Sequence, residues 1–474
     1  MTSINLELTP TIREIPADME TPVSTFIKLK EHGARFLLES VETGRSIGRF
    51  SFIGLDALKN IRLEGENLLI EEKGVTETIS VKGKNPLDLI RELMSPLTLQ
   101  SKDNSLPGLL GGAVGYIGYD FIRWIETLPK TLKDPIDLPT LNLFLTGSLV
   151  IFDHVKRKML LVTLQQEDPQ KRLDQIQEWI RSPLPNEWTH PRPAKNRANF
   201  TSNYTEEEFK EAVLKAKEYI RSGDVYQVVL SQCTQGEIEV EPFQIYRALR
   251  ILNPSPYMYY LDFHDHQLVG SSPEVHSKVI NGEALLRPIA GTRPRGGTPA
   301  EDQALQKELL EDEKERAEHL MLVDLARNDL GRCSTYGSIR CSDLFTVERY
   351  SHVMHIVSQV TGTLSKEEDQ FSLLSKSFPA GTVSGAPKIR AMEVIEELEK
   401  HRRGPYSGTV GYFSLSGNMD MCINIRTIVI KGKTAYLQAG AGIVADSDPA
   451  TEWMETKNKM AALKQAIVQA EEGF

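Results

Sequence analysis

The sequence predicts an α+β fold, in which hairpins of β-strands are combined with helices that do not alternate regularly with them. Two observations support this class. Apolar segments separated by short polar turns indicate antiparallel hairpins, and side-chain capping signals mark the beginnings of separate helices. With 474 residues the chain is long enough for two or three domains or for one large interleaved domain, and it contains no internal repeat.

The first clear hairpin is formed by residues 149–152 and 160–162, which are apolar and are separated by the polar turn DHVKRK. We expect a short amphipathic helix after it, because Leu173, Ile176 and Ile180 recur at helical spacing.

Residues 182–203 contain four prolines and several small polar residues, and this composition predicts a linker. We therefore expect an N-terminal region over residues 1–181 and a second region over residues 204–474.

The second region begins with a helix, because Thr205 and Glu208 form a capping box and Gly223 is a natural helix stop. One face of this helix is apolar and contains Phe209, Val213, Ala216 and Ile220. The following run, residues 225–230, is apolar on both faces and predicts a central strand.

Two more helices have clear beginnings. The capping signal at residues 298–301 opens a long helical region, which we expect to be broken near residues 311–312 and to end around Gly331. The last helix is expected to begin at Asp448 and Pro449.

The composition excludes several classes of protein. Lysine and arginine number 55 and aspartate and glutamate 65, so the net charge of -10 disfavours nucleic-acid binding. The cysteines, which are Cys233, Cys333, Cys341 and Cys422, have no disulfide or zinc spacing and predict reduced thiols in a cytoplasmic protein. We find no signal peptide and no membrane-spanning segment.

The strongest chemical signal is a pair of carboxylates three residues apart on each of two predicted helices. Glu315 and Glu318 share one helix face, and Glu452 and Glu455 share another, with Lys459 one turn further on. Carboxylates that converge in a cleft repel each other unless a cation lies between them, and oxygen ligands with open positions suit Mg²⁺. The alternative interpretation is that each pair belongs to a solvated helix face.

Three glycine-rich segments are weaker signals. Residues 380–388, AGTVSGAPK, precede a helical run and form a candidate anion site of backbone N–H groups, although a capped turn explains them equally well. Residues 440–442 would let a ligand approach the backbone closely, or form a tight turn. Residues 111–118 lack the context of a dinucleotide-binding motif and indicate close backbone packing.

Single polar residues inside apolar runs are further candidates. Gln227 lies in the predicted central strand and is either a satisfied core amide or a group that points into a pocket. Of two similar residues, His355 and Arg426, the arginine favours a ligand carboxylate more strongly, because a buried arginine needs an anionic partner.

Taken together, the motifs resemble the chorismate-utilising enzymes, and most closely the large components of anthranilate synthase. The resemblance runs from about residue 36 to the C-terminus. The segments that carry it are residues 37–54, 253–263, 270–274 (GSSPE), 287–296, 318–332, 350–360, 380–388, 404–414 and 438–459.

The resemblance implies a large interleaved β-sheet sandwich with helices packed outside. It also implies a Mg²⁺-dependent lyase that converts chorismate and ammonia to anthranilate and pyruvate, the first step of tryptophan biosynthesis. A separate glutamine amidotransferase small subunit would deliver the ammonia, in a heterotetramer, because no glutaminase region is recognised in this chain.

The resemblance also assigns roles to single residues. Glu318 and Glu455 would hold Mg²⁺, with Glu315 and Glu452 supporting them. Glu274 would be the general acid that protonates the leaving hydroxyl of chorismate, and His355 and Thr382 would contact the reacting ring. The substrate site would be lined by Gly291, Thr292, Tyr406, Arg426, Gly440, Ala441, Gly442 and Lys459.

Two positions distinguish subfamilies. The relatives that add water carry a lysine base where this chain has Gln227, and those that make 4-amino-4-deoxychorismate carry a nucleophilic lysine where it has Ala290. A neutral amide and an alanine can play neither role, so the pair predicts direct attack by ammonia. The sequence distinguishes the use of ammonia from the use of water more clearly than it distinguishes two possible products, which are anthranilate and the aminodeoxyisochorismate intermediate.

A second pocket is implied by the segments LLES and NPSPYM. Glu39, Ser40, Pro256, Tyr257 and Met258 would bind tryptophan as a feedback inhibitor in the N-terminal regulatory region. A hypothesis from another class is a catalytically inactive regulator that binds tryptophan there, and the intact set of carboxylates argues against it.

Overall fold

The computed structural model describes residues 6–40, 48–99, 106–350 and 353–473. Its centre is one large sheet, in which every pairing between the described strands is antiparallel. The long strands β4 (Phe50–Glu64) and β9 (Leu141–Asp153) pair along their whole lengths, and a register shift between Ala57 and Lys59 bends β4. This bent pair belongs to both halves of the sheet.

The first half extends from the Glu64 end of β4. In spatial order its strands are β6 (Val75–Ser80), β5 (Asn67–Glu72), β4, β9, β8 (Gly112–Ile117), β21 (Thr409–Ser414), β22 (Met419–Ile423), β15 (Val275–Ile280), β16 (Glu283–Leu286) and β19 (Val353–Thr363), which also pairs with β17 (Ile289–Pro294) and β18 (Arg340–Arg349).

The second half extends from the other end. Its order is β2 (Thr11–Pro16), β10 (Lys158–Thr163), β9, β4, β3 (Ala34–Glu39), β13 (Tyr257–Asp262), β14 (His266–Ser272), β23 (Thr427–Lys431), β24 (Thr434–Ile443) and β12 (Gln227–Glu237), which also pairs with β11 (Thr201–Ser202) and β20 (Gly385–Ala386). Early strands thus pair with late ones, as in β3 with β13 and β8 with β21, so the fold is interleaved as predicted.

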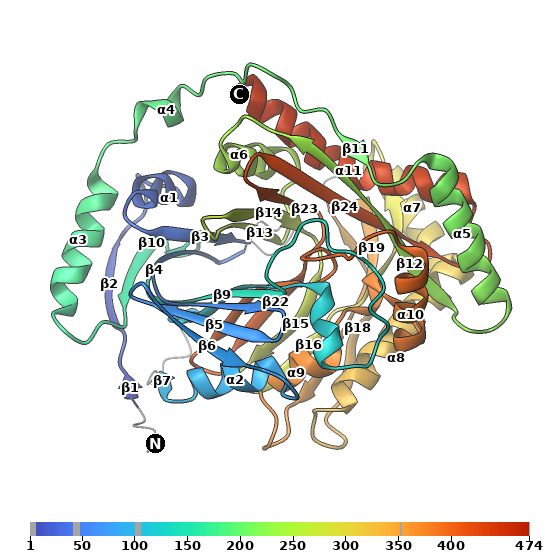
Figure 1. The fold of residues 1–474 in the computed structure, drawn as a ribbon, viewed down its shortest axis with the longest axis horizontal. Coiled ribbons are helices and arrows are strands. Elements are labelled where there is room, and N and C mark those ends of the chain that lie inside the picture. The colour runs from blue at the N-terminus through green and yellow to red at the C-terminus, as the bar shows by residue number, and fades with distance from the viewer. Residues whose placement is uncertain (1–5, 41–47, 100–105, 351–352, 474) are drawn as a thin grey trace.

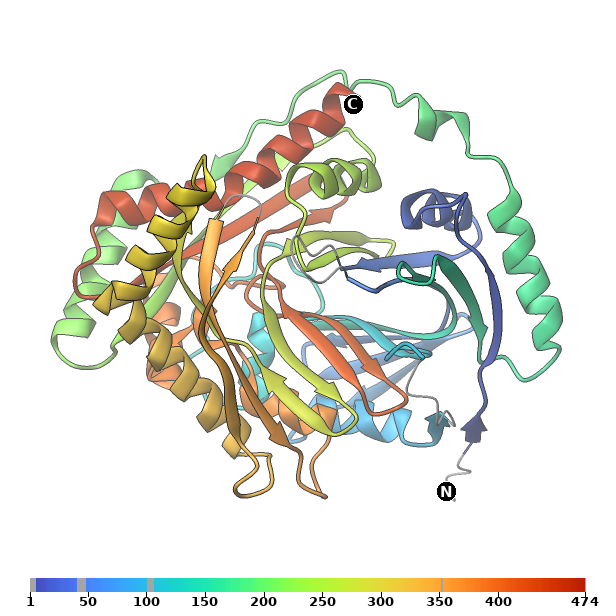
Figure 2. The ribbon, with the colours of Figure 1, turned by 180° about the vertical axis from the view of Figure 1, so that it is seen from behind.

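The helices lie on the outside of the sheet (Figures 1 and 2). They are α1 (Pro22–Lys30), α2 (Pro86–Met94), α3 (Pro169–Arg181), α4 (Asn186–Thr189), α5 (Glu206–Arg221), α6 (Pro242–Leu252), α7 (Pro299–Glu311), α8 (Glu313–Gly331), α9 (Gln370–Ser377), α10 (Lys388–Leu398) and α11 (Pro449–Glu472), with the short 3₁₀ turns η1 (Tyr119–Trp124) and η2 (Gly381–Val383). A separate parallel pair joins β1 (Leu6–Leu8) to β7 (Leu97–Leu99).

The predicted linker crosses the top of the molecule from α3 to β11 and passes the end of α11 (Figure 1). There the amide of Ala194 donates to the carbonyl of Glu471 at 2.7 Å. Because strands from residues 1–181 and 204–474 share one sheet, the two regions are structurally continuous, and the division remains a prediction from sequence.

Most of the expected elements are confirmed. The hairpin is β9 with β10, both helix capping boxes form, and Asp312 ends α7 and caps α8. The central strand begins two residues later than predicted, because Tyr226 is exposed and β12 starts at Gln227. All four cysteines are free, and among the described residues no helix is long and apolar enough to cross a membrane.

The close backbone packing predicted for residues 111–118 is confirmed at Gly115 in β8. A Cβ there would lie 2.0 Å from the carbonyl oxygen of Asn142 on the neighbouring strand β9, and that strand is buried along its whole length. Only glycine therefore lets these two strands approach at this point.

We predict that Gly115→Ala lowers the free energy of unfolding by about 2 kcal/mol or more, because a backbone atom cannot move aside as a side chain would. Gly331→Ala is the matched control, since the nearest atom to its Cβ is Ile339 Cδ1 at 3.7 Å. Urea unfolding midpoints measure both variants. Equal midpoints would contradict this account of the β8–β9 contact.

Candidate functional site

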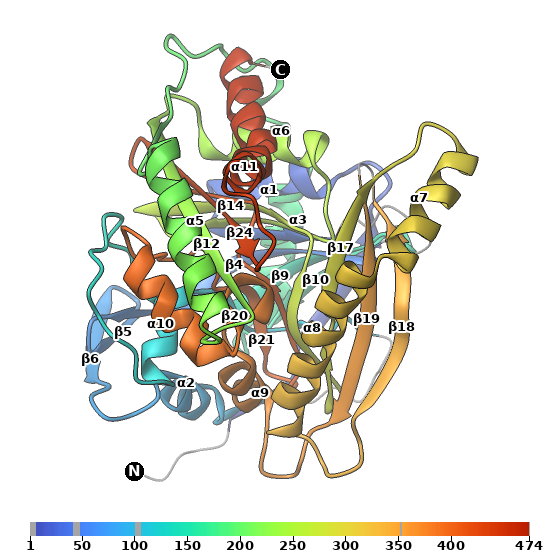
Figure 3. The same ribbon diagram turned by 90° about the vertical axis from the view of Figure 1, so that its right-hand side faces the viewer.

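The main cavity has a volume of about 670 Å³ and lies where the two halves of the sheet approach each other. Strands β12 and β24 form one wall and β17 and β19 form the opposite wall. Helix α8 packs against β17 and β19, and α11 packs against β24 (Figure 3). Residues distant in sequence therefore meet in one place.

Nearly all of the residues predicted for the catalytic site line this cavity. They are Gln227, Glu274, Gly291, Thr292, Glu315, Glu318, His355, Thr382, Tyr406, Arg426, Gly440, Gly442, Glu452, Glu455 and Lys459. The side chain of Ala441 does not line it: successive side chains of a strand point to opposite faces, and Ala441 is fully buried in the apolar cluster beneath α5 and α10. Its assignment to the substrate site stays a prediction.

Glu274 lies between β14 and β15, and its backbone is fixed on both sides. The amide of Ile423 donates to the carbonyl oxygen of Glu274 at 3.0 Å, and the amide of Glu274 donates to the Ser272 hydroxyl at 3.4 Å. Burial raises the pKa of the Glu274 carboxyl to about 8, although the nearby Thr382 hydroxyl and Lys459 ammonium oppose this rise. Glu274 is therefore protonated near neutral pH and can donate a proton.

Thr292 and His355 face each other across the β17–β19 pair. The Nδ1 atom of His355 lies 3.0 Å from the carbonyl oxygen of Gly291 and 3.1 Å from the Thr292 hydroxyl. Because a carbonyl only accepts hydrogen bonds, Nδ1 carries the proton. Burial lowers the pKa of His355, so the ring is neutral, and a neutral ring protonated at Nδ1 has a lone pair on Nε2.

A β-bulge at Gly291 shapes the wall that holds this pair. The register of β17 against β19 shifts between Ala290 and Thr292, and Gly291 has a φ of +67°. A bulge re-aims neighbouring side chains, and residues 289 to 292 all line the cavity as a result. Any other residue at Gly291 would be strained by that backbone conformation.

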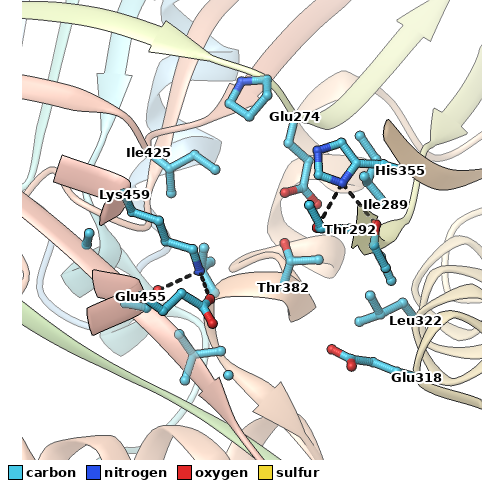
Figure 4. Close-up of a pocket in the computed structure, with 18 of the residues that line it drawn as sticks. Glu274, Ile289, Thr292, Glu318, Leu322, His355, Thr382, Ile425, Glu455 and Lys459 are labelled. Carbon is cyan, nitrogen blue, oxygen red and sulfur yellow. Dashed lines mark hydrogen bonds and ion pairs between the residues drawn. The ribbon is translucent and has the colours of Figure 1, made fainter. Parts of the chain in front are cut away.

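The two carboxylate pairs face each other across the cavity from α8 and α11. Figure 4 shows Glu318 on one side and Glu455 on the other, with Thr382 between them. Burial raises the pKa of Glu318, and the negative charges of Glu315 and Glu455 add to the rise. The amide Nε2 of Gln227 donates to Glu318 Oε1 at 2.9 Å.

The supporting carboxylates are held differently. Arg293 donates to Glu315 at 3.2 Å and to Asp312, the residue that caps α8, at 2.8 Å. Glu452 is buried, which raises its pKa. On the same helix Lys459 bridges Glu455 at 2.5 Å and the carbonyl of Gly440 at 2.8 Å.

The donor set fits Mg²⁺ in its chemistry. Among the described residues, no three His, Cys, Asp or Glu side chains gather closely enough to form a complete metal site. Mg²⁺, however, is usually held by one or two carboxylates and takes its remaining oxygens from water and substrate. Glu318 and Glu455, which face one another and repel, are such a pair.

Arg426 is the residue best placed to bind an anionic group of a substrate. It lies in the turn before β23 with a φ of +53°, a conformation that an L-residue adopts at a cost. Its Nη1 donates to the carbonyl of Lys459 at 3.1 Å, and in the described chain it forms no ion pair. A partly buried guanidinium without a carboxylate partner favours an anionic ligand.

A buried ion pair that the sequence analysis missed supports these walls from behind. Arg403 is only 1% exposed and pairs with Glu399 at 2.7 Å. It also donates to the carbonyls of Val229 on β12 at 2.7 Å and Val383 on η2 at 2.6 Å. The run HRRG resembles an exposed basic turn in sequence, so only the structure reveals this role.

A second cavity of about 580 Å³ contains all five residues predicted for the inhibitor pocket. Glu39 accepts hydrogen bonds there from the Tyr246 hydroxyl at 2.5 Å and from Arg250 at 2.9 Å. Ser40, Pro256, Tyr257 and Met258 complete the set. Pro273 and Ile289 line both cavities, so a single layer of side chains separates them.

The cavity is typical of an enzyme site. It combines a buried carboxyl that is protonated near neutral pH, carboxylates that face each other, and an arginine. A family model described as chorismate binding enzyme matches residues 35–465. Anthranilate synthase component 1 of Acetivibrio thermocellus is 47% identical to this chain, over 98% of it and 96% of the relative. The protein of that name from Aquifex aeolicus is also 47% identical, over 99% and 97%.

Solved structures agree with this result. Anthranilate synthase component I from Streptococcus pneumoniae TIGR4 has a TM-score of 0.80 and 38% identity, over 95% of this chain and 99% of that one. The menaquinone-specific isochorismate synthase of Escherichia coli shares the fold, with a TM-score of 0.72 and 21% identity over 98% and 96%. The chain therefore belongs to the chorismate-binding enzymes and, within them, to the anthranilate synthase component 1 family.

We predict that Glu274→Gln stabilises the protein increasingly with pH. The folded-state pKa of about 8 lies above the ordinary value of 4.5, so the wild type loses stability as the pH rises between those values. The glutamine variant does not lose stability in this range. Its free energy of unfolding should therefore exceed that of the wild type by a few kcal/mol at about pH 8, and the difference should stay constant above that pH. Melting temperatures from pH 5 to 9 measure this; an advantage independent of pH would contradict the assignment.

Proposed function

We propose that this chain converts chorismate and ammonia into anthranilate, pyruvate and water. The observation that carries the proposal is the Glu274 carboxyl, a protonated acid in the cavity that also contains Arg426 and the facing carboxylates. The departure of a ring hydroxyl requires an acid such as Glu274. A substrate with two carboxylates requires positive charge in the site, which Arg426 supplies. Membership of the family supports chorismate as the substrate.

In the proposed reaction Glu274 gives its proton to the C4 hydroxyl of chorismate, which leaves as water while ammonia attacks C2. Arg426 binds the enolpyruvyl carboxylate and fixes the orientation of the ring. The free Nε2 lone pair of His355 can then accept the proton from C2 as pyruvate leaves. The products together contain all the atoms of chorismate and ammonia.

Glu318 and Glu455 would hold Mg²⁺ in this proposal. When bound, the ion would neutralise the ring carboxylate of chorismate and draw charge from the ring. Gln227 keeps Glu318 oriented through its amide hydrogen bond, and Gly442 makes room for that amide, since a Cβ there would lie 2.7 Å from Gln227 Nε2.

The choice of ammonia over water rests on Gln227 and Ala290, which both line the cavity. A primary amide cannot deprotonate water at neutral pH, whereas ammonia attacks without such a base. Ala290 cannot form a covalent adduct with the ring. Ammonia would come from a glutamine amidotransferase subunit.

We predict that the purified chain forms anthranilate from chorismate, Mg²⁺ and ammonium, and that glutamine replaces ammonium only when a glutaminase subunit is added. Anthranilate fluorescence measures both reactions. Glu274→Gln is the control for the chemistry and should lower turnover by roughly 10²–10⁴-fold. Robust use of glutamine by the single chain would contradict the proposal that a separate glutaminase subunit supplies the ammonia.

We predict that Glu318→Gln and Glu455→Gln each weaken Mg²⁺ binding by about tenfold or more, because each removes a charge and a ligand. Calorimetric titration with Mg²⁺ in the presence of anthranilate measures the affinity. Glu313→Gln is the matched control, since Glu313 lies in the first turn of α8 and does not line the cavity. Wild-type affinity in both active-site variants would rule out this metal site.

We also propose that the second cavity binds tryptophan as a feedback inhibitor. Its separation from the reaction cavity requires that inhibition act through two arrangements of the shared wall. Ser40→Val and Met258→Ala should therefore reduce inhibition at least about fivefold while turnover remains. Met19→Ala, whose side chain is 91% exposed, is the control for the methionine change. Competition between tryptophan and chorismate that these variants do not alter would refute the proposal.

A catalytically inactive, tryptophan-binding regulator is the alternative from another class. It would bind tryptophan without forming anthranilate. The protonated Glu274 and the intact carboxylates favour the enzyme.

A further inference from the structure

A small cavity adjoins the main cavity at the acid Glu274. Its volume is about 50 Å³. Glu274, Leu322 and Thr382 line both cavities, so the two share a wall. The cavity is larger than the roughly 15 Å³ that one water molecule requires.

His276 enters this cavity because of a local irregularity in β15. The register of β15 against β22 shifts between Val275 and Ser277, which leaves His276 as the extra residue of a bulge. Bulges re-aim side chains next to active sites. The imidazole is 4% exposed, and its Nδ1 lies 3.1 Å from the Ser277 hydroxyl.

Nε2 of His276 and the hydroxyl oxygen of Thr382 are buried polar atoms of this wall that form no geometrically complete hydrogen bond among the described residues. The Ser377 backbone lies close to the imidazole and the Glu274 carboxyl lies close to the hydroxyl, and each is near enough to affect a pKa, but neither contact completes a hydrogen bond. Buried polar groups almost always form hydrogen bonds, to ordered water where protein is lacking. Together with the Glu274 carboxyl they offer the two to four partners that a buried water needs.

We propose that the cavity binds an ordered water that hydrogen-bonds to His276 Nε2, to the Thr382 hydroxyl and to the Glu274 carboxyl, and that His276 acts through it as a positioning residue. The inference rests on the proposed function of Glu274 as the acid. One carboxyl oxygen is anchored by the water, so the other is directed at the leaving hydroxyl. Without the anchor the carboxyl would rotate between orientations.

The charged groups around this site do not replace the water. Lys388 is paired with Asp329 at 2.9 Å and with the carbonyl of Ser377 at 3.0 Å. Arg287 is paired with Glu348, and Lys459 approaches Glu274 from the main cavity. Burial and the charge of Lys388 lower the pKa of His276 to about 3, so its ring is neutral throughout the working range.

The test compares His276→Leu, which removes the polar atom at similar volume, with His276→Gln, which places a polar atom near the same point. We expect His276→Leu to lower kcat three- to tenfold, as the loss of about one hydrogen bond implies. The KM for chorismate should not change. The alkaline limb of kcat should move up by about half a pH unit, because the carboxylate loses a donated hydrogen bond.

His276→Gln should restore most of the lost kcat and most of the shift in the alkaline limb of kcat. His266→Gln is the control for loss of a buried imidazole, since His266 bonds to Asp265 and Tyr116 far from the cavity. Wild-type kinetics in a folded His276→Leu variant would overturn the proposal.

A high-resolution crystal structure of the wild type tests the water directly and needs no variant. It should show a density peak within hydrogen-bond distance of His276 Nε2 and the Thr382 hydroxyl; an empty cavity would overturn the proposal. If the wild type forms no anthranilate, the proposed function fails, and the density alone then decides whether the water is there.

Discussion

The buried ion pair between Arg403 and Glu399 is the interaction on which the reaction cavity depends. An isolated charge in this position would cost several kcal/mol, and the pair is tolerated because every strong donor of Arg403 has an acceptor. Those acceptors lie on β12 and η2, while Glu399 in turn accepts from the amide and hydroxyl of Ser231. One guanidinium therefore fixes the spacing of three segments that are far apart in the sequence.

The same arrangement explains how polar chemistry is kept inside an apolar sheet. Glu274 lies in the link between β14 and β15, where backbone hydrogen bonds hold it in place while burial raises the pKa of its carboxyl. His355 is fixed as one neutral tautomer by a carbonyl across a bulge. In the proposed reaction the acid and the base thus obtain opposite protonation states from their surroundings, which would let one site perform both transfers near neutral pH.

The sequence predicted what depends on local signals. Capping boxes located α5 and α7, Asp312 marked the break before α8, and the spacing of Glu315 with Glu318 placed both on one helix face. It could not predict that Ala441 faces the core, since a glycine-rich strand gives no sign of its register. Arg403 and His276 were also missed, because their roles depend on burial by distant segments and on a bulge. The remaining site residues were predicted from the family resemblance and not from the periodicity of the sequence.

The central claim is that this cavity directs ammonia, and not water, to the ring of chorismate. The most direct measurement is mass spectrometry of the products formed from chorismate with ¹⁵N-ammonium and Mg²⁺ in ¹⁸O-water. The account predicts anthranilate that carries ¹⁵N, together with pyruvate, and no ring product that carries ¹⁸O. Isochorismate or salicylate labelled with ¹⁸O, or aminated product that retains its pyruvyl group, would contradict it.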